Sequence, residues 1–198
     1  NDVIAPGADG GSVGEVGDAP CDAKEAPPAD ALYVSDKTGV MPAGDGGAGF
    51  GTAENPVKTI AAAIEIARST SRASVIVVDE GTYKEAIELD TYPQSLTIGG
   101  AWVRTGASWA RDCDKSRRAR TLVQSAKDYG ASIKGSPAAV ITLSDMTIRS
   151  RESTSTKDGE PGSSRYGVMV SNAVVVLSDV TIEATTGDAG GRVLTTIT

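Results

Sequence analysis

The residues best suited to bind a ligand lie between positions 101 and 120. This segment, AWVRTGASWARDCDKSRRAR, contains both tryptophans of the chain and six basic residues against two aspartates. An indole face can stack on a sugar ring, and a guanidinium group can bind a carboxylate through two parallel hydrogen bonds. The segment therefore predicts a site for an acidic polysaccharide formed by Trp102, Arg104, Trp109 and Arg111. The alternative is that the indoles pack this connection onto the protein while the bases stay in solvent.

The two cysteines, Cys21 and Cys113, each stand beside an aspartate in a polar segment. Two cysteines are too few for a structural zinc site, so we expect no metal there. In an exported protein such a pair normally forms a disulfide. We therefore expect a Cys21–Cys113 bond, which would tie the start of the chain to the segment rich in tryptophan and arginine.

Two further acids, Asp145 and Asp179, occupy the same place in two copies of a repeat. Residues 139–150 (AVITLSDMTIRS) and 173–184 (AVVVLSDVTIEA) are identical at seven of twelve positions, at an offset of 34. If the copies stack, the two Cα atoms lie roughly 5 Å apart, and the carboxylates would share a proton or attract a cation. The simpler alternative is that each aspartate bonds to its own backbone in a turn.

A defined catalytic set is not recognisable in the sequence, and the catalytic residues stay unknown. The chain contains no histidine, which excludes Ser-His-Asp, Cys-His and histidine-zinc sites. No cofactor motif is found either. An enzyme is therefore the less favoured interpretation.

The repeat indicates how these residues are positioned. Short apolar strands around a Ser-Asp turn, repeated at a fixed offset, are typical of stacked β architectures in which each unit buries its apolar face on the next. A helix is expected over about 56–68, with Asn55 as N-cap and Pro56 at its first position. Polar residues 151–166 read as a loop leaving one corner. The expected strands are 31–34, 74–78, 85–89 and 95–98.

The order LYVS, Gly-rich loop, GTAENPVKTIAAAIEIA, VIVVDEGTYKEAIEL, SLTIGG resembles the N-terminal region of right-handed parallel β-helix proteins, the pectate-lyase-like superfamily. The resemblance covers residues 31–100, and the two repeats extend it as ordinary coils. It implies an all-β solenoid whose open end is covered by one short helix. It does not imply one activity, because that superfamily includes lyases, hydrolases, epimerases, adhesins and proteins without known activity.

Residues 1–30 differ from the rest of the chain. They are rich in Gly, Ala, Pro and Asp and contain seven acids against one base, which predicts a flexible acidic leader before a β-helix over 31–198. The leader resembles those of exported envelope lipoproteins, so we expect a location at the cell surface, in the periplasm or outside the cell. Nucleic acid is not expected as a partner, and no apolar run is long enough to span a membrane.

The last residues, GRVLTTIT, read as the start of another coil, because Gly191 to Leu194 repeat the pattern of Gly167 to Val170. We expect this edge to be completed by a further part of the polypeptide or by a second polypeptide. Three functions remain in competition: an exported, non-catalytic module that binds glycan or protein, a polysaccharide lyase or glycoside hydrolase with part of its active wall elsewhere, and a subunit of a filament or multi-chain assembly.

Overall fold

The computed structural model of the chain describes residues 25–41, 49–70, 74–111, 120–135, 138–152 and 164–184. Most of the leader, most of the polar loop predicted over 151–166, the final GRVLTTIT and both cysteines lie outside these residues. The described elements, in chain order, are β1 (Leu32–Val34), α1 (Ile60–Thr70), β2 (Val75–Asp79), β3 (Gly81–Tyr83), β4 (Ile87–Tyr92), β5 (Leu96–Thr105), β6 (Ser108–Arg111), β7 (Thr121–Gln124), β8 (Tyr129–Gly135), β9 (Val140–Arg149), β10 (Tyr166–Ser171) and β11 (Val174–Glu183).

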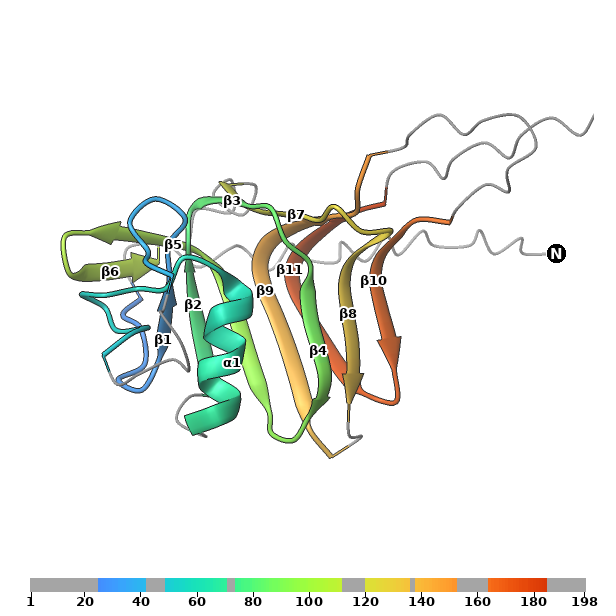
Figure 1. Cartoon of the computed structure of the whole chain (residues 1–198), viewed down its shortest axis with the longest axis horizontal. Helices are drawn as coiled ribbons and strands as arrows, with labels where there is room; N and C mark the ends of the chain where they lie inside the picture. The colour runs from blue at the N-terminus through green and yellow to red at the C-terminus, as the bar shows by residue number, and fades with distance from the viewer. Residues whose placement is uncertain are drawn as a thin grey trace, which may run out of the picture.

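The molecule is mostly β, with parallel strands in a curled arrangement and one helix (Figure 1). One sheet has eight strands and places β1, β2, β5, β9 and β11 side by side; β7 pairs with the second half of β9, and β3 pairs with β7. The other sheet has the order β10-β8-β4. Every strand pair is parallel except β5 with β6, which is antiparallel.

The chain passes repeatedly through both sheets, and each passage lies on the one before it. The first passage consists of β2, β3 and β4, and the second of β5, β7 and β8. The third consists of β9 and β10, and the fourth begins with β11. The two copies of the repeat pair in register, with Leu143 opposite Leu177 and Ile148 opposite Ile182. The stacking predicted from the offset of 34 is therefore confirmed.

The bend inside each repeat is made by its aspartate. Asp145 has a φ of 53° and Asp179 a φ of 57°, so both backbones are left-handed. Aspartate and asparagine tolerate this conformation better than most residues because their short polar side chains bond locally. A second corner also uses a left-handed residue, Asn172, whose side-chain amide donates to the carbonyl of Gly135 at 3.2 Å. The Ser-Asp pair therefore bends one long strand, so that its halves pair with different neighbours.

Helix α1 begins later than the sequence predicted. The prediction of Asn55 as N-cap is wrong because the backbone of the residues that follow is extended, and Val57 exchanges hydrogen bonds with β1 at Tyr33 and Ser35. Thr59 is the N-cap, since its hydroxyl accepts a hydrogen bond from the backbone of Ala62 at 3.1 Å.

The carboxylate of Glu85, from the segment before β4, also caps α1. Its two oxygens accept the backbone N–H groups of Ile60 and Ala61, each at 2.9 Å. A negative charge is favourable at this end of a helix. Burial raises the pKa of Glu85 although these two bonds pull it down.

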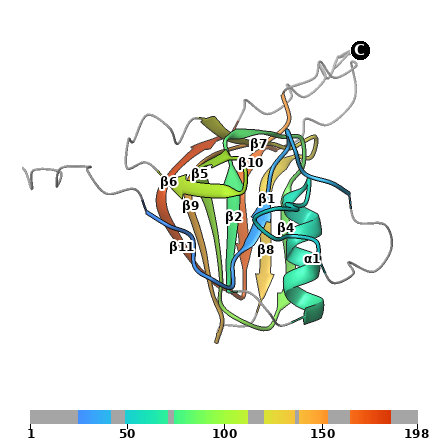
Figure 2. The ribbon, with the colours of Figure 1, turned by 90° about the vertical axis from the view of Figure 1, so that its left-hand side faces the viewer.

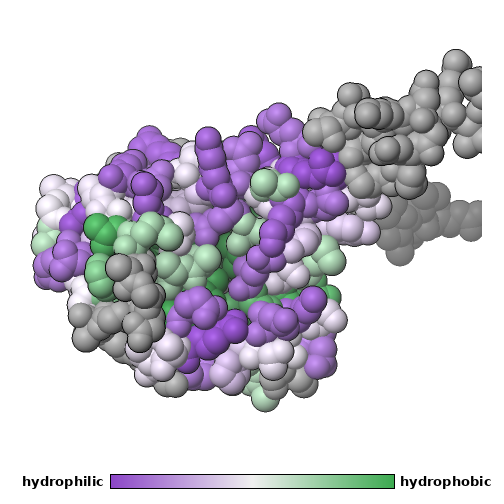
Figure 3. Space-filling view, viewed as in Figure 1, coloured by the Kyte–Doolittle hydropathy of each residue, from purple (hydrophilic) through white to green (hydrophobic). Residues whose placement is uncertain are grey.

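The main core lies between the two sheets and continues under α1, whose buried face includes Ile60, Ala63, Ile64 and Ala67. The helix contacts β1, β2 and β4. It lies beside β4, at the opposite end of the smaller sheet from β10 (Figures 1 and 2). On the face seen in Figure 3, hydrophilic residues form most of the surface, and hydrophobic residues show only between them.

Candidate functional site

The four residues predicted to bind a glycan lie together on one hairpin. The sequence reading of a long connection after residue 100 is wrong for its first part: β5 continues to Thr105, turns at Gly106 and returns as β6. In the antiparallel register Trp102 is opposite Arg111, and Arg104 is opposite Trp109. Because side chains alternate along a strand, the spacing W-x-R in both strands places all four side chains on the same face.

Each arginine of this face lies over the tryptophan opposite it. The Arg111 guanidinium is 5.1 Å from the ring centre of Trp102, and that of Arg104 is 5.9 Å from the ring centre of Trp109. These are cation–π distances, and such pairs stabilise a hairpin modestly. The hairpin was missed in the sequence because its turn residues look like any polar connection.

Both indoles are buried. Trp102 is 2% exposed and Trp109 is 7% exposed, in a small cluster with Ala31 and Val77. The Trp109 ring also lies 5.0 Å from the ring of Tyr33, and its N–H donates to the carbonyl of Ala53 at 3.0 Å. These contacts favour the packing alternative for the two tryptophans, since their ring faces already contact the protein.

Arg111 is held by two carboxylates. Its Nη1 lies 2.6 Å from Asp145 Oδ2, and its Nη2 lies 2.6 Å from Glu25 Oε2. The Asp145 carboxylate therefore has an arginine partner, contributed by the hairpin. Arg111 in turn connects the hairpin, the corner of β9 and the first described residue of the chain.

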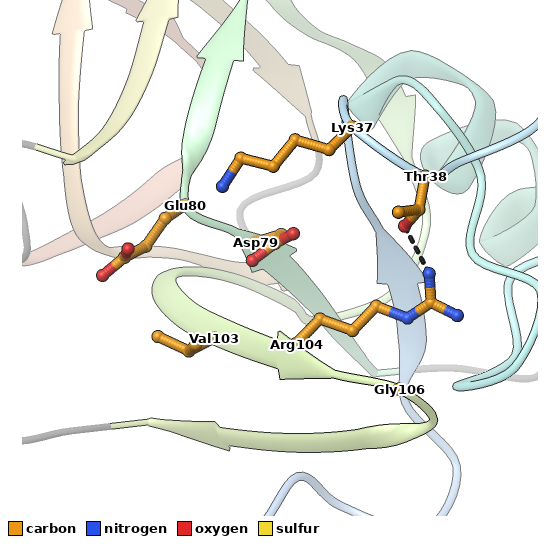
Figure 4. A pocket seen from close by; sticks show the side chains of 7 residues that line it. All are labelled: Lys37, Thr38, Asp79, Glu80, Val103, Arg104 and Gly106. Atoms are coloured by element: carbon orange, nitrogen blue, oxygen red, sulfur yellow. Dashed lines mark hydrogen bonds between the residues drawn. The ribbon is translucent and has the colours of Figure 1, made fainter.

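Beside the hairpin is a pocket of about 310 Å³. It is lined from three parts of the chain: the loop after β1, the end of β2 and the hairpin. Figure 4 shows the ammonium group of Lys37 over the carboxylate of Asp79. The lining residues are Lys37, Thr38, Asp79, Glu80, Val103, Arg104 and Gly106. Of the four predicted binding residues, Arg104 lines this pocket.

A directed chain of hydrogen bonds connects the hairpin with the buried carboxylate. Arg104 donates from Nη1 to the hydroxyl of Thr38, which donates to Ser35 Oγ at 3.1 Å. Ser35, fully buried, donates in turn to Asp79 Oδ2 at 2.9 Å. Arg104 also donates to the carbonyl of Glu54 at 2.9 Å. The guanidinium is thereby fixed in position at the wall of the pocket.

The electrostatics of Asp79 follow from this arrangement. Asp79 is 5% exposed, and burial raises the pKa of its carboxyl above the ordinary 3.8. The hydrogen bond from Ser35 and the positive charge of Lys37 each pull this pKa down. Lys37 makes no ion pair within 4.0 Å in the described part of the chain, so its ammonium is available to a ligand.

The sequence could not have indicated this pocket. Lys37 and Asp79 are 42 positions apart, and neither belongs to a recognisable ligand-binding motif. Only the pairing of β1 with β2, and the return of the hairpin, bring these residues to one place.

Comparison with known proteins decides the family. A family described as "Protein of unknown function (DUF1565)" matches residues 43–197. The chain belongs to the DUF1565 family. DUF1565 is associated with parallel β-helix proteins, which agrees with the parallel strands and the curled sheet. No curated protein and no solved structure matches the chain.

Within the ranges described above, no cluster of three or more acidic, cysteine or histidine side chains is placed to hold a metal ion. None of the described helices is long and apolar enough to cross a membrane.

Proposed function

We propose that the chain is a segment of a right-handed parallel β-helix that acts outside the cytoplasm as a non-catalytic module binding carboxylated glycans. The binding site is the pocket beside the hairpin. One observation carries the proposal: Lys37 presents an ammonium without an ion pair within 4.0 Å among the described residues, at a pocket whose other cation, Arg104, is already fixed in place.

The chemistry of the pocket suits an acidic sugar. The ammonium of Lys37 pairs with the carboxylate of a uronic acid, and Asp79 and Glu80 accept hydrogen bonds from sugar hydroxyls. A volume of about 310 Å³ lies at the lower end of small-ligand pockets and holds one or two sugar units. Recognition in this form needs no stacking on tryptophan, which fits the burial of both indoles.

The test is titration calorimetry of the full chain with polygalacturonate, and with neutral dextran as the comparison. Binding to polygalacturonate alone is expected, and Lys37→Ala should weaken it about tenfold, the usual range for a charged hydrogen bond. The matched control is Lys134→Ala, which removes an exposed lysine on β8 that does not line the pocket.

Two results would contradict the proposal. Equal weakening by both lysine variants would mean that binding is diffuse charge attraction without a site. Progressive shortening of the polysaccharide, followed by chromatography, would show that the protein cleaves glycans and is an enzyme.

A further inference from the structure

The last described passage of the chain leaves one end of the core exposed. We call this the end face. The side chains that form it point inward, and each lies opposite a residue of the preceding passage that is at most 2% exposed. The end face consists of Val168, Val170, Val175, Leu177, Val180 and Ile182.

The exposure of the end face is set by position and not by residue type. Leu177 is 45% exposed, whereas its register partner Leu143 is fully buried. Ile182 is 42% exposed and Ile148 is fully buried. Val170 is 49% exposed on β10. Identical side chains therefore differ only because a further layer covers one set.

The opposite end of the core is covered by α1, so the end face is the end at which another layer fits. In the described part of the chain, β10 pairs with β8 alone and β11 with β9 alone. Each strand thus presents a free edge next to exposed apolar side chains, a combination that folded proteins normally cover.

We propose that residues 190–197 of this same chain cover the end face and add a parallel strand to the free edge of β10. The connection is long enough: four residues link β7 to β8, whereas seven, 184–190, separate β11 from Gly191. The family match continues through residue 197, which places this segment within the DUF1565 unit.

A glycine lies near the start of two strands of the smaller sheet, β8 and β10. A Cβ on Gly130 would lie 2.5 Å from Ile148 Cγ2, and one on Gly167 would lie 1.9 Å from Ile182 Cγ2. A side chain at either position would displace the isoleucine, so these two passages favour glycine here, whereas Ala86 occupies the corresponding position before β4. After β11, Gly187 comes only four residues beyond the strand, and the next glycines are the pair at 190–191.

The residues after this pair supply the missing apolar contacts. Side chains alternate along a strand, so with glycine 190 at the corresponding position Val193 faces Val170, and with Gly191 there Leu194 does so. In both registers an aliphatic side chain covers the exposed valine of β10.

The experiment is amide hydrogen exchange on the full chain, read at residues 191–197. Protection is expected in the wild type, and Leu177→Asp should lower it about tenfold or more through lost burial. Val176→Asp is the matched control. Val176 is 44% exposed on the same strand, but it points outward, opposite Thr142, and its substitution should leave protection unchanged.

A reciprocal variant guards against a general loss of structure. The double variant Val193→Asp/Leu194→Asp should increase exchange at the edge amides of β10, while those of β4, far from the end face, stay protected. Fast exchange of residues 191–197 in the wild type would overturn the proposal. A dimer by sedimentation that Leu177→Asp dissociates would also overturn it, because a second copy would then be the occupant.

Discussion

Replacing Trp109 by alanine separates the packing role of the hairpin from a binding role. The indole is 7% exposed, contacts Tyr33 and donates one hydrogen bond to the Ala53 carbonyl. Removing a buried tryptophan costs about 3–5 kcal/mol. The cluster around Trp109 is small, with only three other buried residues, so we expect about 3 kcal/mol, at the lower end of that range.

Urea unfolding followed by far-ultraviolet circular dichroism measures this change. Fluorescence is less suitable, because the two tryptophans dominate it and the substitution removes one of them. Trp109→Phe is the matched control: it keeps an aromatic ring against Tyr33 and loses the N–H donor, a cost of about 1 kcal/mol from the hydrogen bond. An unchanged free energy of unfolding for Trp109→Ala, together with lost binding of polygalacturonate, would refute the packing role.

Three further predictions follow from individual groups. Glu85→Ala should lower the free energy of unfolding by about 2 kcal/mol, since the first N–H groups of α1 lose a charged acceptor; Glu85→Gln, which keeps an acceptor oxygen, should lose less, and wild-type stability of Glu85→Gln would contradict the role of the charge. The folded-state pKa of Asp79 is raised, so the folded protein binds this proton more tightly than the unfolded chain, and the stability associated with it falls as pH rises through the window that begins near 3.8. Asp79→Asn should therefore flatten the fall of stability above that pH, and a slope equal to that of the wild type would show that the pKa of this carboxyl is not raised. We predict a Cys21–Cys113 disulfide, which the proposed location outside the cytoplasm would favour, and mass spectrometry that finds two free thiols under non-reducing conditions would exclude it.

The stacking of the repeat could be predicted because its physical cause is local. In each copy of the repeat, the Leu makes an inward contact and the Ser-Asp pair makes a left-handed bend. The Thr-Ile pair then makes a second inward contact. Those requirements recur at each layer, so the sequence repeats, and the offset of 34 is the length of one passage with its loop.

The candidate site could not be predicted in the same way because its causes are long-range. Asn55 and Pro56 form a good local helix start, yet pairing of Val57 with β1 outweighs this preference. The sequence around the two tryptophans would look the same whether their rings stacked on a sugar or packed against the protein, as Trp109 does on Tyr33. Only the return of β6 along β5 decides between these alternatives.

Leu143 and Leu177 show where periodicity stops being informative. Both follow the same apolar pattern and point the same way, but one is fully buried and the other 45% exposed. A repeat predicts the direction of a side chain, since direction depends on the strand that carries it. Burial depends on whether another layer lies above, which is a property of neighbouring passages. The comparison of paired residues across layers, and not composition, therefore identifies the end face as the apolar surface that the last described passage leaves exposed.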